Sequence, residues 1–267
     1  MDWSEHDAAL FDLDGVLTPT AKVHMAAWAD MFTSFLATRD EPGAQEPYTD
    51  EDYFAHVDGK PRYDGVAAFL ASRGIEIPHG DPSDPADAIT VCGLGNRKND
   101  EVNRILERDG VDPYPGSLRL LDALREHGTA LAVVSSSANA ETVLTAAGIR
   151  DRFSVVVDGA VARRENLPGK PAPDTFVAAA ERLGVPVGRC VVLEDAESGV
   201  AAGRAGGFGL VVGVDRGAGR DRLTASGADV VVEQPRTAQF VPQTPLRQPG
   251  CRLEVISQTA TLAVSKA

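Results

Sequence analysis

Two aspartates, one residue apart, stand where the first apolar segment of the chain ends. The apolar segment spans residues 8–13, with Asp12 near its end, and Asp14 follows it directly before Gly15. This apolar run is typical of a strand buried on both faces of a parallel sheet. Residues i and i+2 of an extended chain point to the same side, roughly 6–7 Å apart. The two carboxylates are therefore expected to converge where open α/β sheets bind ligands, unless they are only solvated turn residues.

Three further apolar segments are followed by polar residues whose side chains could take part in catalysis or binding. Ser135 directly follows one segment, Lys170 follows another after a loop, and Glu194 with Asp195 follows the third. Each residue has an ordinary alternative as a turn hydroxyl, a solvated ammonium or an acidic first turn of a helix. Their order at successive strand ends favours a single shared site. The three segments are residues 130–134, 155–157 and 190–193.

Four carboxylates gathered at one edge of a sheet require a cation. At an effective dielectric constant of about 20, two such charges roughly 4 Å apart repel by ~4 kcal/mol. Oxygen ligands suit a hard divalent ion, and Mg²⁺ binds through few protein ligands and retained waters. We therefore expect Mg²⁺ near Asp12, Asp14, Glu194 and Asp195, with Lys170 balancing the remaining charge.

The pattern of elements predicts an α/β fold with a Rossmann-like parallel sheet core and an inserted α-helical cap domain. Alternating strands and helices with short connections indicate βαβ units. We expect a discontinuous core formed by residues 1–20 and 109–233, a helical cap at 21–108, and a C-terminal extension of unknown structure at 234–267. Within the cap, helices are predicted from about 21 to 37, 63 to 72 and 96 to 108.

Composition narrows the function further. The chain has 267 residues, a formal net charge of −13 and three cysteines. The acidic balance argues against nucleic-acid binding, and no stretch approaches the ~20 apolar residues of a membrane span. Few and unpaired cysteines suit a reducing compartment. We expect a cytoplasmic monomer that acts on a small molecule, without a nucleic-acid or membrane partner.

The polar strand ends resemble the four motifs of the haloacid dehalogenase superfamily. The motifs match at Asp12-Leu13-Asp14-Gly15, at Ser135, at Lys170 and at Glu194-Asp195, and the resemblance covers roughly residues 8–233. Within the superfamily the sequence is most similar to the β-phosphoglucomutase family. The supporting residues outside the motifs are Thr20-Ala21, 24–28, 59–62, Lys98-Asn99-Asp100, Tyr114-Pro115-Gly116 and 171–174.

The resemblance implies a role for each residue of the core site. Asp12 would be the nucleophile that becomes an aspartyl phosphate, and Asp14 the general acid and base. Ser135 and Lys170 would hold the oxygens of the transferring phosphoryl group. The implied Mg²⁺ ligands are Asp12, the carbonyl group of Asp14, and Asp195, with Glu194 close by.

The cap residues carry the expectation about the substrate. A mutase must bind a second phosphate, and Arg62 is the candidate because guanidinium binds phosphate in a bidentate manner. By the resemblance, Lys98 and Asn99 would contact the sugar or that phosphate, and His24 would link cap closure to Asp14. Without the resemblance, these residues would be interpreted as a solvated helix face and a packing histidine. Trp28 is expected in the cap core in either case and is counted among the substrate-site residues.

Two residues depart from the family pattern. Pro19 stands where a polar residue is expected, and Ala138 stands where a basic residue often follows the serines. Phosphate binding at that loop is therefore expected to depend on backbone N–H groups, Ser137 and Asn139.

The resemblance implies a phosphoryl-transfer enzyme that interconverts β-D-glucose 1-phosphate and glucose 6-phosphate through an aspartyl phosphate and a sugar bisphosphate. The alternative is a sugar-phosphate phosphatase on the same scaffold, in which water attacks the aspartyl phosphate. A dehalogenase is disfavoured, because displacing a halide needs no second acid and would give Asp14 no role. A non-enzymatic binding module is also disfavoured, because it predicts a degraded motif and all four motifs are intact.

Overall fold

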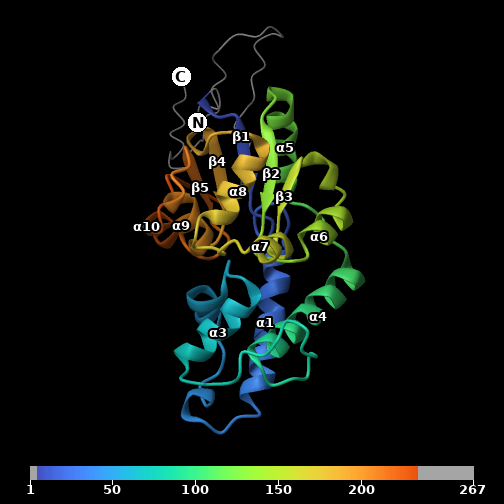
Figure 1. Cartoon of the computed structure of the whole chain (residues 1–267), viewed down its shortest axis with the longest axis vertical. Coiled ribbons are helices and arrows are strands. Elements are labelled where there is room, and N and C mark those ends of the chain that lie inside the picture. The colour runs from blue at the N-terminus through green and yellow to red at the C-terminus, as the bar shows by residue number, and fades with distance from the viewer. Residues whose placement is uncertain (1–4, 234–267) are drawn as a thin grey trace, which may run out of the picture.

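A six-stranded parallel sheet forms the centre of the larger part of the molecule (Figure 1). The computed structural model describes residues 5–233. The strands are arranged in the order β3-β2-β1-β4-β5-β6, so β1 lies between β2 and β4. The predicted α/β class with a parallel sheet is confirmed. The strands are β1 (Ala8–Phe11), β2 (Ala130–Val134), β3 (Val155–Val157), β4 (Cys190–Glu194), β5 (Leu210–Val214) and β6 (Val230–Val232).

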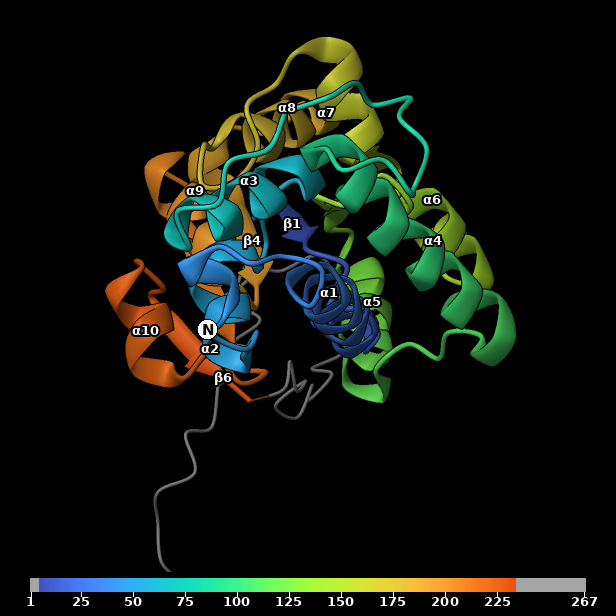
Figure 2. The ribbon, with the colours of Figure 1, turned by 90° about the horizontal axis from the view of Figure 1, so that it is seen from below.

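Helices cover both faces of this sheet, which explains why its central strand lacks polar residues. Ala9 and Phe11 of β1 face one hydrophobic cluster, whereas Ala8 and Leu10 face another, and all four are fully buried. Figure 2 shows α5 and α8 on opposite sides of β1. The helices around the sheet are α5 (Pro115–His127), α6 (Ala140–Ala146), α7 (Gly159–Glu165), α8 (Asp174–Leu183), α9 (Glu197–Ala205) and α10 (Arg220–Ala225).

The segment between β1 and α5 forms a helical unit with its own hydrophobic cluster. Trp28 stacks on Phe32 with ring centroids 5.3 Å apart, and Phe32 lies 4.1 Å from Phe69. These aromatic side chains recur on the inner faces of the helices, as the sequence periodicity predicts. The unit contains α1 (Thr20–Leu36), α2 (Asp50–Asp52), a π-helical turn (Tyr53–Val57), α3 (Arg62–Ser72) and α4 (Val91–Asp109).

The sequence located the three long helices of the helical unit but placed the start of one of them wrongly. The helix expected from about residue 96 begins at Val91, because the Thr90 hydroxyl accepts a hydrogen bond from the Gly93 N–H at 2.9 Å and caps the helix. Thr20 is the first residue of α1, and its hydroxyl donates to Asp14 rather than capping the helix. Helix α7 was not predicted, since its seven residues are too few to show periodicity.

The two chain segments that connect the helical unit to the sheet are tied to each other. The Tyr114 N–H donates to the carbonyl oxygen of Leu17 at 2.9 Å, and the Ser117 hydroxyl donates to that of Val16 at 2.6 Å. The second of these bonds uses the Ser117 hydroxyl, and α5 begins two residues earlier, at Pro115, without a side-chain cap. Pro is well suited to that position because its φ is already helical and it has no N–H to satisfy.

Two expectations fall partly or wholly outside residues 5–233. The C-terminal extension at 234–267 and the cysteine at position 251 lie beyond the described residues. Of the other two cysteines, Cys92 and Cys190 are both buried and free. Among the helices described, none combines the length and hydropathy needed to cross a membrane.

Candidate active site

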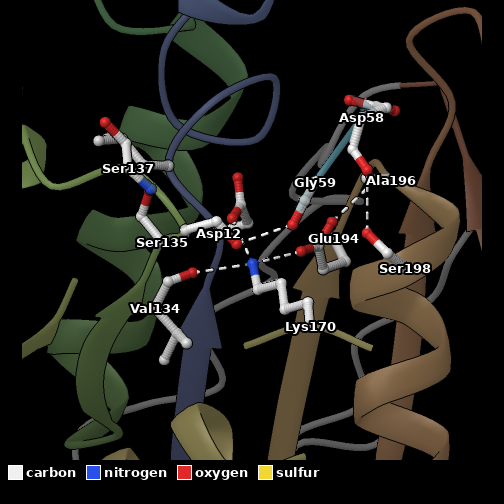
Figure 3. A network of polar contacts seen from close by, with 12 residues as sticks. Asp12, Asp58, Gly59, Val134, Ser135, Ser137, Lys170, Glu194, Ala196 and Ser198 are labelled. Atoms are coloured by element: carbon white, nitrogen blue, oxygen red, sulfur yellow. Dashed lines mark hydrogen bonds and ion pairs between the residues drawn. The ribbon is translucent and has the colours of Figure 1, made fainter. Parts of the chain in front are cut away.

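The carboxyl ends of β1, β2 and β4 bring the polar strand-end residues together (Figure 3). Phe11 pairs with Val133 of β2 on one side and with Leu193 of β4 on the other. Because the strands are parallel and in register, Asp12 emerges between Ser135 and Glu194. Ser135, Glu194 and Asp12 are all less than a tenth exposed. The convergence predicted from the strand ends is therefore present.

Lys170 lies beneath this edge and connects two of the carboxylates. Its Nζ donates to Asp12 Oδ1 at 2.5 Å, to Glu194 Oε1 at 2.5 Å and to the carbonyl oxygen of Val134 at 3.1 Å. Burial lowers the pKa of Lys170, but the two carboxylates together outweigh burial and raise it above its ordinary value. The ammonium group therefore stays charged and fixes the orientation of Asp12 (Figure 3).

Three carboxylates form a cluster that suits a hard cation. One oxygen of each of Asp12, Glu194 and Asp195 lies within 4.8 Å of the others. Burial, reinforced by neighbouring carboxylates, raises the pKa of Asp12 and of Asp195 well above the usual range. Lys170 contacts only two of the three, so this all-oxygen donor set is short of positive charge and fits a divalent metal ion. The Asp14 side chain is outside this cluster.

Two glycines leave room for these carboxylates. A Cβ at Gly15, where φ is +87°, would lie 1.7 Å from Asp195 Oδ2. A Cβ at Gly199 would lie 1.7 Å from Oε1 of Glu194, whose other oxygen accepts from the Ala196 N–H at 2.9 Å. Any larger residue at either position would displace a carboxylate of the cluster.

Asp14 faces away from the cluster toward the helical unit. Thr20 donates its hydroxyl hydrogen to Asp14 Oδ1, and His24 Nε2 lies 3.5 Å from the same oxygen. Nδ1 of His24 is in turn 2.7 Å from Nζ of Lys98, which also lies 4.7 Å from the ring centroid of Trp28. Asp14 thus contacts the helical unit, whereas Asp12 contacts Lys170.

The side chains of Lys98 and His24 are deeply buried, and burial lowers the pKa of both. Burial lowers the pKa of Lys98 to about 7; Asp14 opposes this effect and Arg62 adds to it. Burial also lowers the pKa of His24 to about 4, helped by the charge of Lys98. At neutral pH the imidazole is therefore uncharged, and Lys98 lies close to its titration midpoint.

The remaining predicted residues lie on both sides of the gap between the sheet and the helical unit. The Arg62 guanidinium donates to Asn96 Oδ1 at 3.2 Å, and its Cζ lies 5.7 Å from the centroid of the Tyr63 ring. Nδ2 of Asn139 donates to Oδ1 of Asn99 at 2.8 Å, which joins the two parts. In the serine loop, Ser135 Oγ accepts from the Ser137 N–H at 3.0 Å, and Ser137 Oγ accepts from the Asn139 N–H at 3.2 Å.

One cavity of about 440 Å³ connects most of these residues. Its wall contains eleven of the thirteen predicted site residues. Lys170 is excluded because it lies below Asp12 and Glu194, and Asn139 because its amide group is directed to Asn99. The eleven are Asp12, Asp14, His24, Trp28, Arg62, Lys98, Asn99, Ser135, Ser137, Glu194 and Asp195.

The structure adds contacts that the sequence did not predict. The Ser198 hydroxyl donates to the carbonyl oxygen of Asp58 at 3.1 Å (Figure 3). The Ser136 hydroxyl donates to that of Gly59 at 2.7 Å, so two serines of the sheet part hold one loop of the helical unit. Burial raises the pKa of the Asp58 carboxyl to about 7. Nothing in the spacing of these residues indicates that they meet, because the contacts depend on how the two parts pack.

Comparison with known proteins places the chain in a family. The family model described as haloacid dehalogenase-like hydrolase matches residues 6–207, and the chain belongs to this family. The family indicated by the four motifs is therefore confirmed, and the protein is an enzyme of this class.

Individual relatives include both kinds of enzyme considered for the sequence. A beta-phosphoglucomutase of Mycobacterium bovis is 53% identical over 232 residues, which cover 84% of this chain and 88% of the relative. A fructose-1-phosphate phosphatase of Escherichia coli is 30% identical over 214 residues, covering 78% and 97%. The crystal structure of beta-phosphoglucomutase from Clostridium difficile has the same fold, with a TM-score of 0.70, 23% identity and coverage of 88% and 94%.

Proposed function

We propose that this enzyme is a β-phosphoglucomutase, which interconverts β-D-glucose 1-phosphate and glucose 6-phosphate through a sugar bisphosphate. The observation that carries the proposal is the distribution of charge around one cavity. The sheet part contributes Asp12 with the Lys170 ammonium beneath it, and the helical unit contributes Arg62 and Lys98 to the wall. A single phosphate needs only one group of cations, whereas a sugar bisphosphate needs one at each end. The 53% identity to the mycobacterial beta-phosphoglucomutase supports the same conclusion.

Asp12 and Asp14 would divide the chemistry between them. A carboxylate oxygen of Asp12 attacks phosphorus, and the P–O bond to the sugar breaks as the leaving oxygen takes a proton from Asp14. In the reverse direction a sugar hydroxyl attacks the aspartyl phosphate and returns its proton to Asp14. The contact from Thr20 and the nearby imidazole of His24 support this role, because both hold the Asp14 carboxyl away from the three-carboxylate cluster.

The charge of the phosphoryl group would be matched from several directions. The Ser135 hydroxyl would contact its oxygens at the carboxyl end of β2, and the Lys170 ammonium beneath Asp12 would supply positive charge to them. Asp12 and Asp195, with Glu194 beside them and the Asp14 carbonyl group completing the set, would hold Mg²⁺, which when bound supplies positive charge to those oxygens. Positioning and charge neutralisation are the main requirements of phosphoryl transfer.

The helical unit would recognise the rest of the substrate. Arg62 would bind the phosphate that is not being transferred, since guanidinium can donate two parallel hydrogen bonds to it. Lys98 and Asn99 would contact the sugar, with Trp28 behind Lys98. The bonds from Ser136 and Ser198 to the Gly59–Asp58 loop keep the two parts together and so limit the access of water.

A sugar-phosphate phosphatase is the second candidate, favoured by the similarity to the fructose-1-phosphate phosphatase. The two are separated by incubating the enzyme with β-D-glucose 1-phosphate, Mg²⁺ and a catalytic trace of glucose 1,6-bisphosphate. Glucose 6-phosphate is followed with a coupled dehydrogenase, and released inorganic phosphate is measured in parallel. A mutase forms glucose 6-phosphate in large excess over inorganic phosphate; release of phosphate without glucose 6-phosphate would establish the phosphatase.

A further inference from the structure

A second arginine, Arg163, lines the same cavity as Arg62 but comes from the sheet part. Its helix, α7, packs directly on the serine loop: a Cβ at Gly159 would lie 2.6 Å from the carbonyl oxygen of Ser136 and 3.1 Å from the backbone nitrogen of Ala138. Residues four apart share one side of a helix. Arg163 is four residues after Gly159 and therefore lies on the side of α7 that faces this loop.

Neither guanidinium has a carboxylate partner in the part of the chain that the structure describes. No ion pair within 4 Å joins Arg62 or Arg163 to an acidic residue over residues 5–233. The next residue behaves differently, because Arg164 pairs with Glu165 at 3.1 Å on the surface. Burial lowers the pKa of Arg62, and the charge of Arg163 lowers it further, so the two cations are near enough to repel each other.

The other candidates for a cation at this end of the cavity are occupied or absent. Lys60 also lines the wall, but its ammonium donates to the carbonyl oxygen of His56 at 2.8 Å. The serine loop itself ends in the uncharged Ala138. Arg163 is thus the cation that the sheet part offers opposite Arg62.

We infer that Arg163 is a binding residue for the phosphate of the sugar bisphosphate that is not being transferred. Arg62 binds this phosphate from the helical unit, and Arg163 binds it from the sheet part. The inference rests on the proposed function. A dianion between the two guanidinium groups removes their mutual repulsion and accepts charge-assisted hydrogen bonds from both. Because the two arginines belong to different parts of the molecule, the bound phosphate also ties those parts together.

Equilibrium binding tests the inference without turnover. In an Asp12→Asn background, glucose 1,6-bisphosphate is titrated calorimetrically into proteins that also carry Arg163→Gln, Arg163→Lys or Arg164→Gln. We expect Arg163→Gln to weaken binding by about tenfold to a hundredfold, the usual effect of losing hydrogen bonds to a charged group. Arg163→Lys should recover part of the loss, because it restores charge but not the bidentate geometry. Arg164→Gln is the matched surface control and should stay within about twofold of the background.

Two results would overturn the inference. One is an Arg163→Gln affinity within about twofold of the Arg164→Gln control, and the other is a background protein that does not bind the bisphosphate. Failure of the proposed function is recognised separately, by the absence of glucose 6-phosphate in the turnover assay of the wild-type enzyme. A phosphatase that still binds the bisphosphate through Arg163 would satisfy the first test and fail the second.

Discussion

Nζ of Lys98 lies 2.7 Å from Nδ1 of His24, and this contact joins helix α4 to helix α1 next to the reacting groups. When Lys98 is charged it donates to Nδ1, which leaves the ring hydrogen on Nε2, 3.5 Å from Asp14 Oδ1. The proton on the proposed acid–base residue and the charge on a cap lysine are thereby connected through one imidazole ring. A phosphate that approaches Lys98 changes the charge at one end of this chain of contacts.

The lowered pKa of Lys98 predicts how stability depends on pH. Burial brings the folded pKa to about 7 from the ordinary 10.5, so between these values the unfolded chain holds a proton that the folded chain lacks. Stability rises with pH wherever the unfolded state binds more protons. Relative to Lys98→Met, the wild-type enzyme should therefore become more stable as the pH rises from about 7 to 10.5.

Urea unfolding at several pH values between 6.5 and 9.5 measures this difference. The exposed Lys22 provides the matched control, because Lys22→Met should show a difference from wild type that is nearly independent of pH. A wild-type to Lys98→Met difference that stays constant across the range would contradict the assignment of a lowered pKa.

The nucleophile is tested by Asp12→Asn. The amide keeps the shape of the side chain but cannot attack phosphorus, so turnover should fall by roughly 10⁴-fold or more. Lys170 keeps its bond to Glu194, and cooperative thermal unfolding should persist. Circular dichroism and the coupled assay measure the two effects. Substantial residual turnover by the folded variant would refute the role given to Asp12.

Arg62→Ala should impair reactions that need a second phosphate more than reactions of a substrate with one phosphate. The kcat/KM of the mutase reaction should fall by about tenfold to a hundredfold, while the slow hydrolysis of phenyl phosphate, which has one phosphate, changes far less. Arg104→Ala is the control, because Arg104 pairs with Glu101 on an exposed helix face. Equal losses in both reactions would argue against a role for Arg62 at the second phosphate.

Gly15→Ala tests the three-carboxylate cluster by filling the space that Asp195 occupies. The added methyl group would lie 1.7 Å from Asp195 Oδ2, so the carboxylate must move and the affinity for Mg²⁺ should fall by about tenfold or more. Gly74→Ala is the control, since Gly74 also has a positive φ, +64°, but no atom within 4 Å of the new Cβ. The control should lose about 1 kcal/mol of stability without a change in metal dependence.

Activity measured during titration with Mg²⁺ after treatment with a chelator gives the metal affinity of each variant. Wild type and Gly74→Ala should recover at the same Mg²⁺ concentration, and Gly15→Ala only at a higher one. The same recovery for all three would mean that Asp195 does not take part in metal binding.

The convergence of the core-site residues was predictable from their positions directly after strands. Asp12, Ser135 and Glu194 each follow a buried parallel strand, and parallel strands necessarily end at one edge of their sheet. Lys170 was harder to place, because helix α7 and a further loop, where a loop alone was expected, separate it from β3. The resemblance to a known family supplied its role, and the bonds to Asp12 and Glu194 show how close it lies.

The contacts between the two parts could not be predicted in the same way. The Ser136 hydroxyl meets a backbone carbonyl group 77 residues away, at Gly59, and a backbone acceptor leaves no mark on the sequence. Arg163 was missed because α7 is short and two adjacent arginines resemble an ordinary solvated helix face. Arg163 differs from its neighbour in the structure: Arg163 lines the cavity, whereas Arg164 pairs with Glu165 on the surface.

The bonds between the two connecting segments have a consequence for how such an enzyme can change. Since Tyr114 is bonded to Leu17 and Ser117 to Val16, the helical unit leaves and re-enters the sheet part at one point. None of its residues contributes a strand to the sheet. The unit is therefore a cassette: evolution or design can exchange it for another of different size and specificity while the strands that carry the nucleophile keep their register.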